Sequence, residues 1–277
     1  MRMKTKIMNL LLAAALCLMC CAACTDAADI PDADAGTTTG AIRFTAVRPA
    51  PLATRSVSGN DRWKGDGTEK IGVQLLGKGL LLEGIYTITA PDGTADALAG
   101  DKPVFWPGKQ ESWKIAACYP LPGTYDISDQ STPEKFRQAD ILITALAPFT
   151  YAGSTPVSLQ FRHGMAKVRV ELTGADDAGG EIKVEIRSFK KIGFNLGQID
   201  CDPEEAYITA CRDTGDPATV AFEAMVPAMV VTKQDFIRIT IGSKTYRFTP
   251  GADSPGVLHS GHVYTYHVAI PSASTNP

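Results

Sequence analysis

Residues 157–173 read VSLQFRHGMAKVRVELT, and the second half of this stretch decides the fold class. From residue 167 onward, charged and apolar side chains alternate one by one. The apolar members are Val168, Val170 and Leu172, and the charged members are Lys167, Arg169 and Glu171. Successive side chains of a β-strand point to opposite faces, so a period of two is typical of a strand with one face buried. The stretch therefore predicts a half-buried strand of an antiparallel sheet.

The same pattern recurs on both sides of this stretch. Strands are expected at 41–47, 70–76, 85–90, 113–119, 140–147, 157–161, 167–173, 182–189, 207–210, 219–225, 236–241, 244–248 and 262–270. Turn sequences rich in Gly, Pro and Asp separate them, and Gly242-Ser243 predicts a tight two-residue hairpin. Only 133–139 could form a short helix or a loop. Many short strands at this spacing are typical of β-sandwiches.

The length of the β-rich region predicts two domains in series. More than one sandwich is needed for so many strands. The boundary is placed in the Gly- and Pro-containing segment 152–156. We therefore expect an all-β chain with antiparallel β-sandwich domains at 41–156 and 157–277.

The first 23 residues have the composition of an export signal. Three basic residues precede a short apolar run, Met8–Met19, which is too short to span a bilayer. Ala22-Ala23-Cys24 follows, and small residues before a cysteine are what a lipoprotein signal peptidase needs. Cys24 is therefore the expected lipidation site, with Cys21 as the alternative. A lipid on Cys24 would anchor the mature chain to an outer membrane.

Residues 24–40 read as a flexible acidic tether, because they carry several Asp residues and no apolar periodicity. The whole chain has 27 basic and 30 acidic side chains. Residues 1–23 hold three basic side chains and no acidic one, so the remainder has 24 against 30 and a net charge of −6. This mildly acidic balance, without a basic stripe in the sequence, argues against nucleic acid as a partner.

The cysteines and histidines do not form a recognisable metal or catalytic pattern. Cys118 lies in an apolar strand and is expected to be buried, whereas Cys201 and Cys211 could pair as a disulfide across a local loop. His262 and His267 are five residues apart on one expected strand and so point to opposite faces. No nucleophile elbow or ligand spacing is evident. We therefore expect no metal, no cofactor and no enzymatic activity.

Several short motifs occur in a recognisable order after the tether. They are Ile42-Arg43-Phe44, Thr54-Arg55, Phe105-Trp106-Pro107, then Phe161-x-His163-x-x-Ala166-Lys167-Val168, and finally Gly261-x-x-Tyr264-x-Tyr266. Together they resemble the fimbrillin family of Bacteroidetes, the type V pilins and their accessory subunits. The resemblance covers essentially the whole chain after the tether. The acidic tether also resembles the export signal of Bacteroidetes surface lipoproteins.

This resemblance implies a lipoprotein precursor with two transthyretin-like sandwiches. In polymerising members an Arg-specific protease cuts near the first strand, and a strand from a neighbouring subunit fills the groove that this opens. Arg55 occupies the family's Thr-Arg position, and 41–47 would be the strand removed. The implied partners are other fimbrial subunits, and the implied location is the cell surface, then the fimbrium after processing. Stalk, tip and lipid-retained anchor roles all remain open.

The alternative leaves Arg55 as an ordinary linker residue and keeps 41–47 in place. The chain would then be a surface lipoprotein that never polymerises and that binds a glycan or a host ligand.

Overall fold

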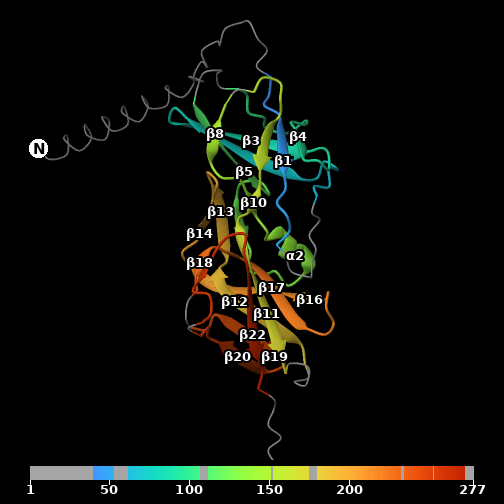
Figure 1. Cartoon of the computed structure of the whole chain (residues 1–277), viewed down its shortest axis with the longest axis vertical. Coiled ribbons are helices and arrows are strands. Elements are labelled where there is room, and N and C mark those ends of the chain that lie inside the picture. Colours follow the sequence, from blue (N-terminus) through green and yellow to red (C-terminus); the bar gives the residue numbers. More distant parts are fainter. Residues whose placement is uncertain are drawn as a thin grey trace, which may run out of the picture. The chain divides into compact units, whose positions relative to one another are not determined.

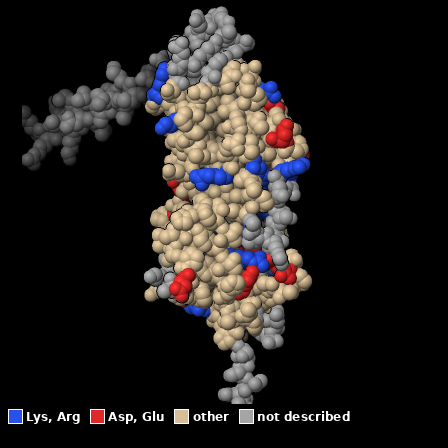
Figure 2. All heavy atoms as spheres, viewed as in Figure 1, with Lys and Arg blue, Asp and Glu red and all other residues tan. Residues whose placement is uncertain are grey.

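The computed structural model describes residues 40–52, 62–106, 112–150, 152–174, 180–231, 234–251 and 253–271. Strands dominate these residues, and the prediction of an all-β chain is confirmed (Figure 1). In the part of the chain that is described, no helix combines the length and the apolar character that a membrane span needs. On the face shown in Figure 2, acidic and basic side chains are interspersed among uncharged ones.

The N-terminal half is built on one nine-stranded sheet with the path β10-β7-β5-β2-β3-β4-β1-β9, and β8 pairs with β5 off this path. Its strands are β1 (Phe44–Val47), β2 (Lys70–Gly77), β3 (Leu80–Ile88), β4 (Thr94–Asp96), β5 (Trp113–Tyr119), β7 (Leu142–Ile143), β8 (Ala147–Phe149), β9 (Val157–Gln160) and β10 (Arg162–His163). Only Phe161 separates β9 from β10, the two ends of the path. The sheet therefore has to curl until its two edges meet.

Two four-stranded sheets form the C-terminal half. One has the order β16 (Cys211–Asp213), β17 (Val220–Pro227), β11 (Met165–Thr173) and β22 (Val263–Ala269). The other has β15 (Glu205–Thr209), β12 (Ile182–Phe189), β19 (Ile237–Ile241) and β20 (Lys244–Phe248). Smaller sheets join β14 (Gln198–Cys201), β13 (Lys191–Asn195) and β6 (Thr124–Asp126), and pair β18 (Met229–Val230) with β21 (Val257–Leu258). Buried side chains from both four-stranded sheets share one hydrophobic core.

The change between the two sheet systems falls after β10. Sequence patterning places residues from 157 onward in the C-terminal half. In the structure β9 pairs with β1 and β10 pairs with β7, so both belong to the N-terminal sheet. The two four-stranded C-terminal sheets begin at Met165 in β11, whereas β6, which lies earlier in the chain, pairs with β13.

Among the described residues one short helix is present, α2 (Pro133–Gln138), in the segment where the sequence predicts either a helix or a loop. Thr132 caps it by accepting a hydrogen bond from the Lys135 backbone N–H, and Pro133 occupies the first turn. Its one buried side chain, Phe136, packs into the C-terminal core.

Tight hairpins connect several neighbouring strands. The predicted hairpin at Gly242-Ser243 is confirmed, since Ile241 pairs with Lys244. The β13–β14 hairpin is not expected from the sequence; its turn residues Leu196 and Gly197 have φ angles of 45° and 85°. Such a turn needs positive φ at both positions, and leucine is unusual there.

Two hydrophobic cores share strand β5. Trp113, Ile115 and Ala117 face the N-terminal core. Ala116 and Cys118, on the opposite face of the same strand, belong to the C-terminal core. Burial of both faces couples the two halves, because neither core is complete without this strand.

The charged face of β11 is buried rather than solvated, which the alternation in the sequence does not predict. Lys167 and Arg169 are only 3% and 7% exposed. The Arg169 guanidinium contacts Asp213 at 2.6 Å and Glu223 at 2.9 Å, and Lys167 Nζ lies 3.2 Å from Glu223. Buried cations need such carboxylate partners, and here β16 and β17 supply them.

Candidate functional site: the seat of strand β1

Strand β1 is the most N-terminal strand of the described chain (Figure 1). It is hydrogen-bonded to a neighbouring strand on each side. It runs antiparallel to β4, with Phe44 opposite Ala95, and parallel to β9, with Phe44 opposite Val157. Pro49 and Pro51 follow it, and proline cannot donate to a sheet ladder. The strand is therefore short, and it ends where the chain leaves the sheet.

The inward face of β1 is fully buried. Ile42, Phe44 and Ala46 are each 1% exposed, whereas Arg43 and Val47 on the opposite face are exposed. The Phe44 ring meets the Tyr86 ring edge to face, with centroids 4.8 Å apart. Burying an isoleucine and a phenylalanine contributes roughly 3–6 kcal/mol.

We call the groove that holds this strand the β1 seat, which is formed by β4, β9, Trp63, Tyr86 and Gly93. Trp63 Nε1 donates a hydrogen bond of 2.7 Å to the carbonyl oxygen of Ala46. Gly93 has a φ of +89°, and a Cβ atom there would lie 2.0 Å from the same oxygen. The seat therefore accepts the backbone of β1 only because residue 93 carries no side chain.

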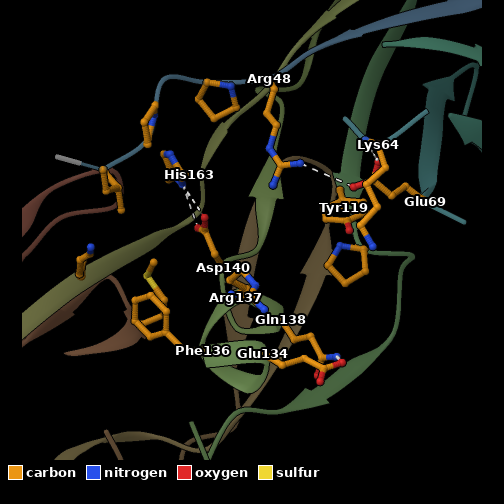
Figure 3. Close-up of a pocket in the computed structure, with 16 residues that line it drawn as sticks. Arg48, Lys64, Glu69, Tyr119, Glu134, Phe136, Arg137, Gln138, Asp140 and His163 are labelled. Carbon is orange, nitrogen blue, oxygen red and sulfur yellow. Dashed lines mark hydrogen bonds and ion pairs between the residues drawn. The ribbon is translucent and has the colours of Figure 1, made fainter. Parts of the chain in front are cut away.

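The residue after β1 is held by aromatic rings. The Arg48 guanidinium lies 4.8 Å from the Trp63 ring centroid and 5.8 Å from that of Tyr119. Its Nη1 is 3.7 Å from Glu69 Oε1 (Figure 3). Glu69 also accepts the Lys64 backbone N–H at 2.6 Å. Burial raises the pKa of Tyr119, which keeps that ring neutral beside Glu69.

A second contact holds the same segment at Ala50. The Nε2 atom of His163 lies 2.9 Å from the Ala50 carbonyl oxygen, and Nδ1 lies 2.8 Å from Asp140 Oδ1. Figure 3 shows the ring of His163 turned toward Asp140. Asp140 follows α2, and His163 ends β10, so these two elements fix the path of the chain after β1.

A cavity of about 530 Å³ opens beside this segment. Its lining includes Arg48, Leu52 and Lys64. Arg55 and Cys24, the predicted cleavage and lipidation residues, lie outside the described residues. Leu52 precedes and Lys64 follows, in sequence, the segment that contains Arg55. The described residues on both sides of that segment therefore include one that lines this cavity.

The remaining predicted residues lie elsewhere. Cys201 is in β14 and Cys211 is in β16, and both thiols are free, so the disulfide suggested by the sequence is not formed in this structure. Cys118 is buried, as predicted. The ring of His262 lies 6.0 Å from that of His259, whereas His267 pairs with Glu171 of β11. Within the described ranges, no group of His, Cys, Asp and Glu side chains could hold a metal ion.

Strand β1 is evident from the sequence, but the contacts that retain it are not. His163 belongs to a quoted motif, yet its partners are Asp140 and the carbonyl oxygen of Ala50, which lies 113 residues earlier. The role of Trp63 likewise depends on a backbone oxygen of β1. Neither contact has a local sequence signal.

Comparison with known proteins identifies a family and several solved structures that this chain resembles. A family described as fimbrillin-like matches residues 54–276. The fold resembles a crystal structure of a candidate cell adhesion protein from Bacteroides ovatus, with a TM-score of 0.60, 16% identity and coverage of 84% of this chain and 93% of that one. A candidate cell adhesion protein from Bacteroides uniformis gives 0.58, 18%, 86% and 95% for the same quantities. No curated protein matches the sequence.

Proposed function

Because this chain belongs to the fimbrillin-like family, we propose that it is a structural or adhesive subunit of a surface fimbria and that its subunits join by strand exchange. The proposal needs a strand that can leave and a groove that can accept a replacement. It assigns no catalytic step to the chain. The solved structures with the same fold come from candidate cell adhesion proteins, which agrees with a location at the cell surface.

The observation that carries the proposal is the position of β1 in its sheet. The strand is hydrogen-bonded to β4 and β9, and among the described residues every other strand follows its C-terminal end. One cut in the chain after Val47 therefore disconnects it from everything that follows. An internal strand would need two cuts.

Arg55 is the cleavage residue that we propose. It follows β1, lies in the family's Thr-Arg position and precedes Trp63 of the β1 seat. A cut there separates the signal, tether and β1 from residues 56–277. If Cys24 carries a lipid, the same cut also removes the membrane anchor, so the mature subunit becomes free to enter a fibre.

Loss of β1 would expose apolar side chains and unpaired backbone groups of the groove to water, which is energetically unfavourable. The Ala46 partner of Trp63 Nε1 would be gone, as would the Phe44 ring beside Tyr86. The ladder edges of β4 and β9 would also be open. A strand from another subunit could pair with both ladder edges and fill the apolar positions, provided that its alternate residues are apolar like Ile42 and Phe44. Release of that strand would expose them again, so the join should dissociate slowly.

The test is treatment of the purified mature protein with a trypsin-like Arg-specific protease, followed by gel electrophoresis without boiling. We expect a new N-terminus at Ser56 and a ladder of species that collapses on boiling. Arg55→Gln is the matched control and should stay monomeric. Cleavage at Arg55 that yields only monomers would refute strand exchange for this chain. It would favour the alternative, a surface lipoprotein that binds a glycan or host ligand without polymerising.

A further inference from the structure

His163 makes two hydrogen bonds that a neutral imidazole cannot make together. Its Nδ1 lies 2.8 and 3.0 Å from the two carboxylate oxygens of Asp140, and its Nε2 lies 2.9 Å from the Ala50 carbonyl oxygen. A carbonyl oxygen only accepts, as does an ionised carboxylate, whereas a neutral imidazole has a single N–H. Both bonds therefore require one additional proton, shared between the His163 ring and the Asp140 carboxyl.

The Ala50 carbonyl oxygen belongs to residues 48–52, which form no strand. Pro49 and Pro51 flank Ala50 and have no backbone N–H, so this segment cannot continue the ladder of β1. The backbone beside His163 is held in the fold, since the N–H of Gly164 donates a hydrogen bond of 2.7 Å to the carbonyl oxygen of Ile141. His163 thus ties a proline-bounded segment to the folded body of the protein.

We propose that protonated His163 is a latch that holds the segment after β1, and that loss of its proton loosens both this segment and the retention of β1. The regulatory consequence rests on the proposed function, because it concerns access to Arg55. The latch itself rests only on the contacts of His163, Asp140 and Ala50.

The direction of the pH effect follows from the surroundings of the ring. Burial alone lowers the pKa of His163, but the hydrogen bond and the negative charge of Asp140 outweigh it, so the pKa is raised above its ordinary value. Arg48, on the same segment as Ala50, opposes this rise. The other charged groups that line the cavity beside the ring are Lys64, Glu69, Glu134, Arg137 and Lys167.

A raised pKa in the folded state makes the latch strongest in acid. It is fully formed below the ordinary histidine pKa of about 6.5, and it is lost as the pH rises through the raised folded-state value. Alkaline conditions should therefore favour cleavage and release of β1. The hydrogen bond to a charged donor is worth about a tenfold change in the population of the open segment.

The test measures cleavage after Arg55 in the mature protein between pH 6 and pH 9. Each rate is divided by the rate for a peptide of residues 48–62 at the same pH, which removes the pH dependence of the protease. The wild-type ratio should rise about tenfold with pH. His163→Gln should give a high ratio that does not change with pH, and Asp140→Asn should shift the rise to lower pH. Equal profiles in all three proteins would overturn the latch.

A second measurement separates the latch from the proposed function. Hydrogen exchange is measured at the Ala46 and Phe161 amides, which donate to the carbonyl oxygens of Gly93 at 2.8 Å and Val47 at 2.9 Å and so report the retention of β1. The rates are corrected for intrinsic exchange and followed beside an NMR titration of the His163 ring in uncleaved protein. Exchange should accelerate as the ring loses its proton in wild type, and it should already be fast in His163→Gln. Should this hold while Arg55 resists cleavage at every pH, the latch stands and the cleavage proposal fails. Exchange that is independent of ring titration would refute the latch. Should His163→Gln fail to fold, Asp140→Asn carries both measurements.

Discussion

Replacing Phe44 with alanine tests whether β1 is a seated strand. The side chain is 1% exposed and packs edge to face on Tyr86. Truncation of a buried phenylalanine costs about 3–5 kcal/mol of unfolding free energy. Because β1 is a terminal strand, the loss cannot exceed the free energy with which it docks, so we expect about 3 kcal/mol. That loss corresponds to a rise of more than a hundredfold in the population of undocked β1.

Denaturant unfolding of the uncleaved mature protein measures this loss. Phe105→Ala is the matched control, since Phe105 is 53% exposed and its truncation should cost less than about 1 kcal/mol. A loss below about 0.5 kcal/mol for Phe44→Ala in uncleaved protein would refute the packing of β1 and, with it, the strand-exchange proposal.

Three further predictions concern other parts of the molecule. Gly93→Ala should destabilise the uncleaved protein by at least about 2 kcal/mol, because the added Cβ meets the Ala46 carbonyl oxygen and the φ is positive; an unchanged denaturation midpoint would contradict this. Glu223→Gln should cost about 3 kcal/mol by chemical denaturation, since it leaves the Arg169 cation under-compensated in a buried site, and a loss no larger than that of a typical surface substitution would argue against it. Cys24→Ser should abolish incorporation of labelled palmitate and release the protein from the membrane fraction, and continued labelling would move the lipid site elsewhere.

Strands in which apolar and polar residues alternate strictly are predictable, because every second side chain is buried in a core. Val168 and Val170 face a core, and the period of two shows it directly. Strand β4 could not be predicted, because Thr94–Asp96 carries no apolar pattern and forms a strand only between β1 and β3. The turn at Leu196 depends on a distant partner, since its N–H is held by Gln74 Oε1 at 2.9 Å.

The candidate site is predictable only in outline. The alternation of Ile42 and Phe44 and the order of the motifs identify β1. The contacts that hold it join residues far apart in sequence, such as Trp63 with Ala46 and His163 with Ala50. A single sequence does not show that residues so far apart are in contact, so the β1 seat and the contacts after it could be found only in the structure.

The sharing of β5 by two cores limits how this chain can be rearranged. A fragment that ended between the halves would expose the Cys118 face of β5, which is buried against C-terminal side chains in the intact protein. The opposite fragment would lose part of its own interior. The halves are therefore unsuited to exchange as independent modules, through recombination or protein engineering. Selection should act on the pair as one heritable unit, and the two halves should melt in a single cooperative transition.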